Sequence, residues 1–253
     1  GGNVSVTGTG GGFGASSLNY GVYLAINSQI TAGGTGTVTV VGNGGATTGG
    51  TNIGVVVFDS GSQITSGGGD VNVTGKEGGG VGSSGIRVNG AISTATNGGN
   101  LSLIANSIEI NGGGGSVSTN STSTLRLQPF TAGTQINLGS SFDPTGGPLS
   151  LFDAELDRMT TGSLIIGDAT AGAISVSAAI TRPAATNVQL ISGGDINVSG
   201  GGFDTGGGTL LLDPGSALAA IKPTFNGMDV TASRLSLGGD LNIAINGTTA
   251  GNG

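Results

Sequence analysis

The chain has 253 residues, of which 56 are glycine and only 8% are charged, and its formal net charge is −7 at pH 7. Seven basic residues are too few for a nucleic-acid surface, and the absence of Cys and His excludes disulfides, thiolate metal sites and imidazole chemistry. So much glycine is typical of disordered tracts, but the positive mean hydropathy of +0.22 argues against disorder.

A short unit recurs along the chain: Gly-Gly, then Asn or Asp, then three residues that alternate apolar, polar, apolar. The Asn or Asp of this unit stands at Asn3, Asp70, Asn100, Asp195 and Asp240. Gly, Asn and Asp tolerate the positive φ of a tight turn, and the alternation that follows predicts a half-buried strand. We therefore expect these five residues to be structural turn positions.

Residues 1–100 carry glycine-rich repeats of about 30–34 residues, a period within the range of solenoid repeats. Strands are expected to begin at Val4, Val38, Val71 and Leu101, one in each repeat. Each of the first three repeats adds a second apolar strand, at 20–22, 53–55 and 85–88, and a third, at 28–31, 62–65 and 91–94. Three strands in each repeat of this length indicate a solenoid.

Residues 101–253 continue the pattern with tighter repeats. Apolar-polar-apolar triplets mostly follow one another at intervals of about 8–15 residues, which suits short strands joined by turns. Two neighbouring triplets would fit one coil of 20-odd residues, so we expect the same rod to continue with a different repeat. Residues 153–159 are the one stretch where a helical turn is expected.

The predicted fold is therefore all-β: a parallel β-helix, or β-solenoid, that forms a single elongated rod over residues 1–253. A sandwich or a propeller would also use short, evenly spaced strands. Both use more aromatic residues than this chain has, since Trp is absent and Tyr occurs twice. The aliphatic core and tight corners of a β-helix fit the composition better.

Residues 149–167 (LSLFDAELDRMTTGSLIIG) and 172–180 (GAISVSAAI) resemble a segment of filamentous haemagglutinin-like exoproteins, the large adhesins exported by two-partner secretion. The resemblance is close over these two stretches and loose over the rest of the chain. It implies a right-handed helix, export through an outer-membrane transporter partner, and a place at the outer surface of a Gram-negative cell. The secretion domain of such exoproteins is not recognisable in the chain.

The densest polar cluster is acidic. It comprises Asp153, Glu155, Asp157 and Arg158, with Asp168 and Asp143 nearby in the sequence. Carboxylates on one face of a β-helix could form the acid and base pair of a polysaccharide-degrading enzyme. They could instead cap a turn between coils, with Arg158 paired to a carboxylate. The second interpretation is favoured, because the short glycine-rich loops lack aromatic residues on which sugar rings stack.

The repeats suggest two other kinds of site. Asp70, Asp195 and Asp240 could ligate Ca²⁺, but Asn fills the same place at Asn3 and Asn100, which favours a turn-forming hydrogen bond over a metal ligand. A flat threonine face that orders water is disfavoured, because Ser5, Thr39, Asn72 and Ser102 are expected to share one position in successive coils. No catalytic residue, metal or cofactor is expected.

The sequence thus predicts a non-catalytic structural and adhesive segment of a secreted bacterial surface protein, acting as a stiff shaft in surface attachment or in filament and matrix formation. The alternative is a polysaccharide-degrading β-helix enzyme with an acidic site near residues 153–168. Expected partners are the transporter, surface glycans or proteins, and further copies of the chain in a fibre, with no nucleic acid. Residues 1–4 lack the features of a signal peptide, and we interpret the chain as a fragment of a longer one.

Overall fold

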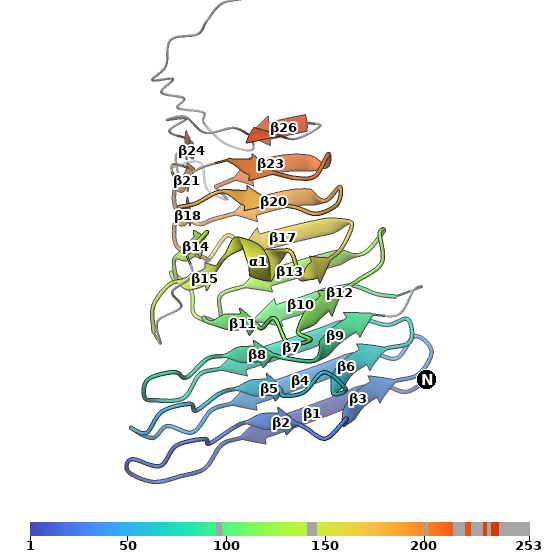
Figure 1. Cartoon of the computed structure of the whole chain (residues 1–253), viewed down its shortest axis with the longest axis vertical. Helices are drawn as coiled ribbons and strands as arrows, with labels where there is room; N and C mark the ends of the chain where they lie inside the picture. Colours follow the sequence, from blue (N-terminus) through green and yellow to red (C-terminus); the bar gives the residue numbers. More distant parts are fainter. Residues whose placement is uncertain are drawn as a thin grey trace, which may run out of the picture.

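The computed structural model describes residues 1–94, 98–140, 146–198, 200 and 202–214, together with the strands at 221–223, 230–231 and 234–237. Within these residues the chain winds into coils that stack along one axis, and the strands of neighbouring coils pair in parallel (Figure 1). The predicted all-β parallel β-helix is confirmed. No helix in the described residues is long and apolar enough to cross a membrane.

One sheet, here called sheet A, runs through the whole described stack. Each coil contributes one strand to it, and the first four of these strands begin at Val4, Val38, Val71 and Leu101, as predicted. Its strands are β1 (Val4–Thr9), β4 (Val38–Asn43), β7 (Val71–Lys76), β10 (Leu101–Ile104), β13 (Thr124–Gln128), β17 (Ser163–Gly167), β20 (Asn187–Ile191), β23 (Thr209–Asp213) and β26 (Arg234–Leu237).

Two shorter sheets complete the lower coils, which confirms three strands for each repeat there. Sheet B contains β2 (Val22–Leu24), β5 (Val55–Val57), β8 (Ile86–Val88) and β11 (Ile108–Ile110). Sheet C contains β3 (Gln29–Ala32), β6 (Gln63–Ser66), β9 (Ala91–Thr94), β12 (Ser116–Ser118) and β16 (Met159–Thr160).

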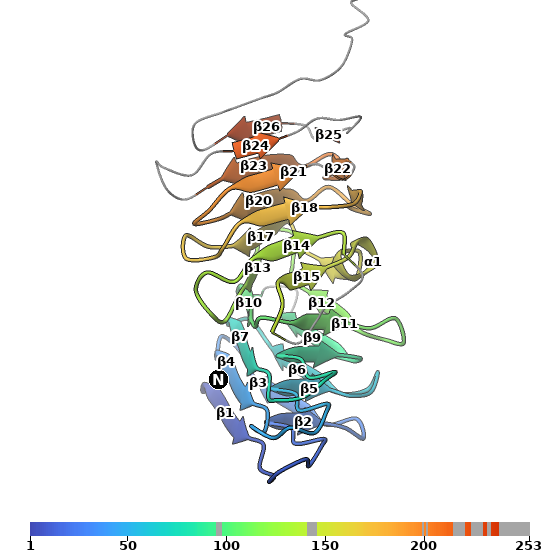
Figure 2. The ribbon, with the colours of Figure 1, turned by 90° about the vertical axis from the view of Figure 1, so that its left-hand side faces the viewer.

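Different sheets serve the upper coils, and Figure 2 shows them beside sheet A. Sheet D contains β15 (Leu149–Leu151), β14 (Ile136–Leu138), β18 (Ile174–Val176), β21 (Ile196–Val198) and β24 (Ile221–Pro223). Sheet E contains β19 (Ile180–Thr181), β22 (Phe203–Asp204) and β25 (Val230–Thr231). The step between strands of sheet A shortens after Leu101, but the coil that begins there still uses sheets B and C, through β11 and β12. The change of sheets therefore comes one coil later than the predicted change of repeat.

One upper coil is longer than the tight repeat predicts. The register places Leu101 beside Leu125 and Leu125 beside Leu164, so the second of these coils takes up much more of the chain than the first. The additional segment includes β15, which pairs with β14 from the side that faces β11, and helix α1 (Asp153–Leu156). After β14 the chain thus returns toward the lower coils to form β15, below β14, before it continues upward. The predicted helical turn at 153–159 is confirmed by α1.

The core is a set of aliphatic columns inside the coils. In the strands of sheet A the buried residues alternate with partly exposed ones, and register pairing stacks like on like. One column runs through Val40, Val73, Leu103, Leu127 and Ile166, all without exposed surface. Each such side chain stabilises the fold by about 1.5–3 kcal/mol relative to an exposed one.

The outward-facing residues of sheet A also form a column, and its register is the one predicted. This register argues against a threonine face. Ser5, Thr39, Asn72 and Ser102 occupy one position in four successive strands of sheet A. The next position along this column is Arg126. Ile165 follows it and Leu211 lies further along, so the outer face of sheet A carries both polar and apolar side chains.

Two glycines of the repeat unit have a different role from the one expected. Gly69 and Gly99 of the Gly-Gly-Asn/Asp units do not have the positive φ that a turn would demand. A Cβ on Gly69 would lie 2.4 Å from the carbonyl oxygen of Gly36 in the coil below, and one on Gly99 would lie 2.3 Å from Asp70 Oδ1. Glycine is needed here because successive coils approach too closely for any side chain.

Replacement of Leu127 by alanine should lower the free energy of unfolding by about 2–5 kcal/mol, because it leaves a cavity in a column that cannot close around it. Urea denaturation followed by circular dichroism measures this loss. Ser102→Ala, on the outer face of the neighbouring strand, is the control and should change stability by less than about 0.5 kcal/mol. Equal losses in the two variants would contradict the assignment of the inner and outer faces.

Candidate functional site

Three predicted turn positions lie in one place, directly before a strand of sheet A. Asn3 Oδ1 accepts the backbone N–H of Thr37 at 3.0 Å, and Asn100 Oδ1 accepts that of Thr124 at 2.9 Å. Asp70 Oδ1 accepts the N–H of Asn100 at 2.8 Å. Each of these side chains thus binds the equivalent residue of the next coil, which is the structural role that the alternation between Asn and Asp indicates.

The other two predicted turn positions do not share that place. Asp195 lies before β21 in sheet D, where its carbonyl accepts the N–H of Ile174 at 2.9 Å, and Asp240 lies outside the described residues. Asn187, which the repeat unit does not include, makes the bond to the next coil instead, accepting the N–H of Thr209 at 3.1 Å. In the described part of the chain, no three acidic side chains are grouped so as to hold a metal ion.

The acidic cluster divides into two parts. The first part lies on α1, between β15 and β16. Glu155 is 4% exposed, and its carboxylate accepts the N–H of Ile110 at 3.0 Å and that of Phe152 at 3.3 Å. Asp153 Oδ1 accepts the N–H of Thr181 at 2.6 Å. These two carboxylates therefore join α1 to the coil below, through β11, and to the coil above, through β19.

Asp157 follows α1 and lies near two arginines. Partial burial raises the pKa of the Asp157 carboxyl and the charge of Asp153 adds to that shift, while Arg182 and Arg158 oppose it. Arg158 donates to the carbonyl groups of Ala154 and Ile110, so its role differs from the predicted pairing with a carboxylate.

Arg182 is a structural residue that no sequence pattern singled out. It is buried, with only 5% of its surface exposed, and its guanidinium donates to the carbonyls of Leu156 and Met159. Burial lowers the pKa of this guanidinium, and Asp157 and Asp153 oppose that shift. Arg182 follows β19, so it connects the first strand of sheet E to the end of α1 and the start of β16.

Asp168 is the second part of the cluster and lies at the end of β17. Burial would raise the pKa of its carboxyl, but hydrogen bonds hold it below the ordinary value. Oδ1 accepts the N–H groups of Thr170 and Ala171 at 2.7 and 2.9 Å, and Oδ2 accepts Gln128 Nε2 at 2.9 Å. None of these partners bonds to the α1 carboxylates, so the structure does not bring the four predicted residues into one site. Asp143 lies outside the described residues.

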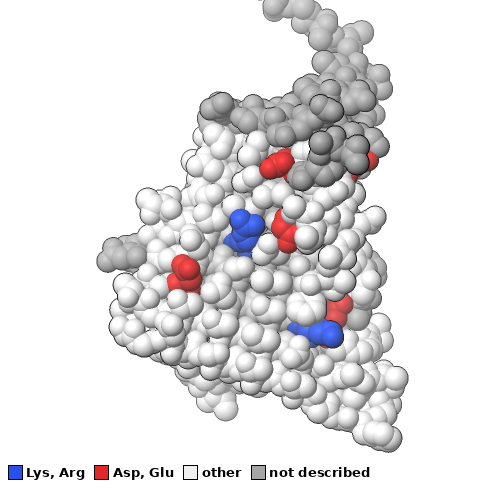
Figure 3. All heavy atoms as spheres, turned by 180° about the vertical axis from the view of Figure 1, so that it is seen from behind, with Lys and Arg blue, Asp and Glu red and all other residues white. Residues whose placement is uncertain are grey.

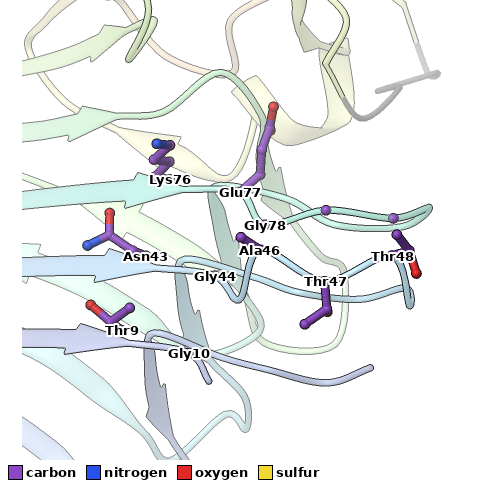
Figure 4. Close-up of a pocket in the computed structure, with 12 residues that line it drawn as sticks. Thr9, Gly10, Asn43, Gly44, Ala46, Thr47, Thr48, Lys76, Glu77 and Gly78 are labelled. Carbon is purple, nitrogen blue, oxygen red and sulfur yellow. The ribbon is translucent and has the colours of Figure 1, made fainter. Parts of the chain in front are cut away.

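A groove of about 730 Å³ lies beside the ends of β1, β4 and β7, and it is lined by those ends and by the glycine-rich segments that follow β4 and β7 (Figure 4). Thr9, Asn43 and Lys76 are the last residues of the three strands and occupy one register position. They form a ladder of three polar side chains along the groove, hereafter the groove ladder.

The groove ladder is not engaged in holding the fold. Among the described residues, the side chains of Thr9 and Asn43 have no hydrogen-bond partner, and the Lys76 ammonium has only a contact to the ring of Phe130, 6.0 Å from the ring centre. This differs from Asn3, Asp70 and Asn100, whose side chains bond the next coil. The alternation within the strands could have identified the ladder as outward-facing, but not the groove beside it.

Glu77 is the second charged residue of the groove lining. Burial raises the pKa of its carboxyl, although the N–H of Gly146 donates to it and opposes the shift. The Oε2 atom is shielded from solvent and has no hydrogen-bond partner within the described residues. The groove therefore carries one basic and one acidic side chain, next to each other in the sequence.

Charged groups are sparse elsewhere too. Seen from behind in Figure 3, the described surface shows a few scattered acidic and basic side chains and no continuous patch of either sign. Such a surface favours neither a polyanion nor a polycation as a general partner.

A row of aromatic rings on the first two coils is a further feature that the sequence did not predict. The rings of Tyr20 and Tyr23 stack with centroids 4.9 Å apart, and Phe58 lies 5.4 Å from Tyr23. Beside them Ile26 has a φ of 59°, and Asp59 accepts its N–H. Tyr23, which lies within β2, and Phe58 are 44% and 51% exposed, so the row forms an exposed aromatic surface.

No protein-family model matches the chain, and no curated protein and no solved structure is similar enough to count as a match. The residues and their arrangement are therefore what any functional assignment rests on.

Arg182→Ala should lower the free energy of unfolding by about 2–4 kcal/mol, because the buried carbonyls of Leu156 and Met159 lose their donor. Arg158→Ala is the matched control, since its carbonyl partners lie closer to solvent, and should cost less than about 1 kcal/mol. Thermal unfolding of both variants makes the comparison. A larger loss for Arg158→Ala would contradict the role assigned to Arg182.

Glu77→Gln should stabilise the protein at pH 7 by less than about 1 kcal/mol, because it removes a partly buried charge that solvent still screens in part. A carboxyl whose pKa is raised by folding weakens the fold as pH rises through the unfolded and then the folded pKa. The advantage of the variant should therefore shrink as the pH is lowered through that window. Urea titrations at several pH values measure it, and an advantage that grows toward low pH would contradict the direction of the shift.

Proposed function

We propose that this chain is a non-catalytic structural and adhesive segment of a secreted bacterial surface protein. The observation that carries the proposal is the continuous sheet A, which joins the coils into one stack with an unbroken aliphatic core. Such a stack is stiff, because neighbouring coils share both backbone hydrogen bonds and side-chain columns. A stiff rod holds its outward residues at fixed spacing, so that many weak contacts add through avidity.

The use made of the polar side chains supports a structural role. Asn3, Asp70 and Asn100 bond the backbone of the next coil, and Asp153 and Glu155 bond the coils on either side of α1. A side-chain oxygen that accepts a backbone N–H is held in a fixed position by that bond. These side chains therefore hold neighbouring coils together.

The proposal extends to location and partners through the resemblance of residues 149–167 and 172–180 to filamentous haemagglutinin-like exoproteins. On this view the parent protein leaves the cell through an outer-membrane transporter and displays the rod at the outer surface. Surface glycans, matrix proteins and further copies of the rod are its proposed partners.

The alternative function is that of a polysaccharide-degrading enzyme, and one observation favours it. The Asp157 carboxyl has a raised pKa beside the charge of Asp153, which resembles the pairing of an acid with a carboxylate in glycoside hydrolysis. Asp168, however, has partners of its own, and Asp153 is bonded to Thr181. We therefore favour the structural function.

The test combines adhesion and cleavage on the 253-residue chain. Beads coated with the folded chain should attach under flow to glycan-coated or matrix-coated surfaces better than beads coated with the heat-unfolded chain. The same preparation should release no reducing ends from a panel of neutral and acidic polysaccharides. Reproducible cleavage that is lost in Asp157→Asn would establish the enzyme instead, and equal attachment of folded and unfolded chain would contradict adhesion.

A further inference from the structure

The groove beside β1, β4 and β7 has the properties of a ligand site that the fold itself does not use. Its volume of about 730 Å³ lies within the usual range of about 300–1,000 Å³ for small-molecule sites. The groove ladder of Thr9, Asn43 and Lys76 runs along it (Figure 4), with one rung for each coil, at the spacing of about 4.8 Å between neighbouring strands.

The hydrogen-bonding groups of the ladder suit a hydroxyl-rich ligand. Thr9 offers a hydroxyl, Asn43 an amide that both donates and accepts, and Lys76 an ammonium with three donors. None of these groups has a hydrogen-bond partner among the described residues. Each hydroxyl of a ligand both donates and accepts, so a ladder of mixed donors and acceptors can bind several hydroxyls in a row.

Several backbone N–H groups of the groove are already bonded, which makes the groove a poor docking edge for an extended peptide. The N–H of Gly44 already bonds Lys76 O at 2.8 Å, that of Gly78 bonds Asn52 O at 2.8 Å, and that of Gly79 bonds Gly45 O at 3.1 Å. Addition of a strand requires free main-chain groups and pockets for alternate side chains. Ala46 is the one residue of the lining with a purely apolar side chain, so side-chain pockets of that kind are not provided.

The charges of the groove indicate an uncharged ligand. Lys76 and Glu77 are its two charged lining residues, and they have opposite sign. A sulfated or uronic-acid polymer would place repeated negative charges near Glu77 with one lysine to balance them, and this is unfavourable compared with a neutral chain.

We propose that this groove binds a short stretch of uncharged oligosaccharide, with the Asn43 amide and the Lys76 ammonium as its principal hydrogen-bonding groups. The inference rests on the proposed adhesive function and gives that function a ligand class. Binding at one groove is weak by itself, and copies of the rod displayed together would multiply it.

The test begins with the folded chain on an array that holds neutral, sulfated and uronic-acid glycans, and continues with calorimetric titration of the neutral oligosaccharide that binds best. Asn43→Ala and Lys76→Ala should each weaken binding by about tenfold, because each removes a hydrogen-bonding group from the site. Gln63→Ala is the matched control: it removes an outward amide on sheet C that has no side-chain partner in the described residues, and binding should not change. Circular dichroism verifies that all three variants are folded.

Three results would overturn the inference: binding confined to sulfated or uronic-acid glycans, binding of no glycan, or binding of a neutral glycan that both groove variants retain. In the last case, Tyr23→Ala tests whether the glycan binds at the aromatic row instead. If Tyr23→Ala loses binding while both groove variants keep it, the site lies on the first two coils of sheet B. If beads coated with Asn43→Ala or Lys76→Ala still attach like wild type, the groove proposal fails while the adhesive function stands. If wild-type beads do not attach, the adhesive function fails by itself.

Discussion

The vertical register between coils is the constraint on which the rest of the structure depends. Each strand of sheet A lies directly over its counterpart, so that Val4 pairs with Val38, Val38 with Val71 and Val71 with Leu101. This register stacks aliphatic residues into columns and brings backbones so close that Gly69 and Gly99 admit no Cβ. It also places Asn3, Asp70 and Asn100 within hydrogen-bond distance of the next coil.

Much of the fold could be predicted because the register leaves a periodic trace in the sequence. The nearly even steps from Val4 to Val38, Val71 and Leu101 are the lengths of the first three coils. The coil between Leu125 and Leu164 escaped prediction, because β15 looks like any other apolar triplet. Its position between β11 and β14 depends on a reversal of stacking order, which no local pattern encodes.

The sites were harder to predict than the fold, because proximity in sequence is a poor guide to proximity across coils. Asp153, Glu155 and Asp157 stay together on one short segment, but Asp168 follows β17 and bonds Gln128 at the end of β13, 40 residues away. The groove ladder has the opposite character: Thr9, Asn43 and Lys76 are far apart in sequence and meet because they occupy one register position. They are candidates for ligand binding because their side chains have no hydrogen-bond partner among the described residues, and a sequence does not show which side chains are unbonded.

The most direct measurement of the register uses spin labels on cysteines, which the chain lacks naturally. Ser5, Arg126 and Gln189 lie in one outward column of sheet A, in the first, fifth and seventh strands. At about 4.8 Å for each step, labels at Ser5 and Arg126 should be about 19 Å apart, and labels at Ser5 and Gln189 about 29 Å apart. Double electron–electron resonance distances that increase in this proportion are the predicted result. Distances that do not increase with the number of coils would contradict a parallel, in-register stack.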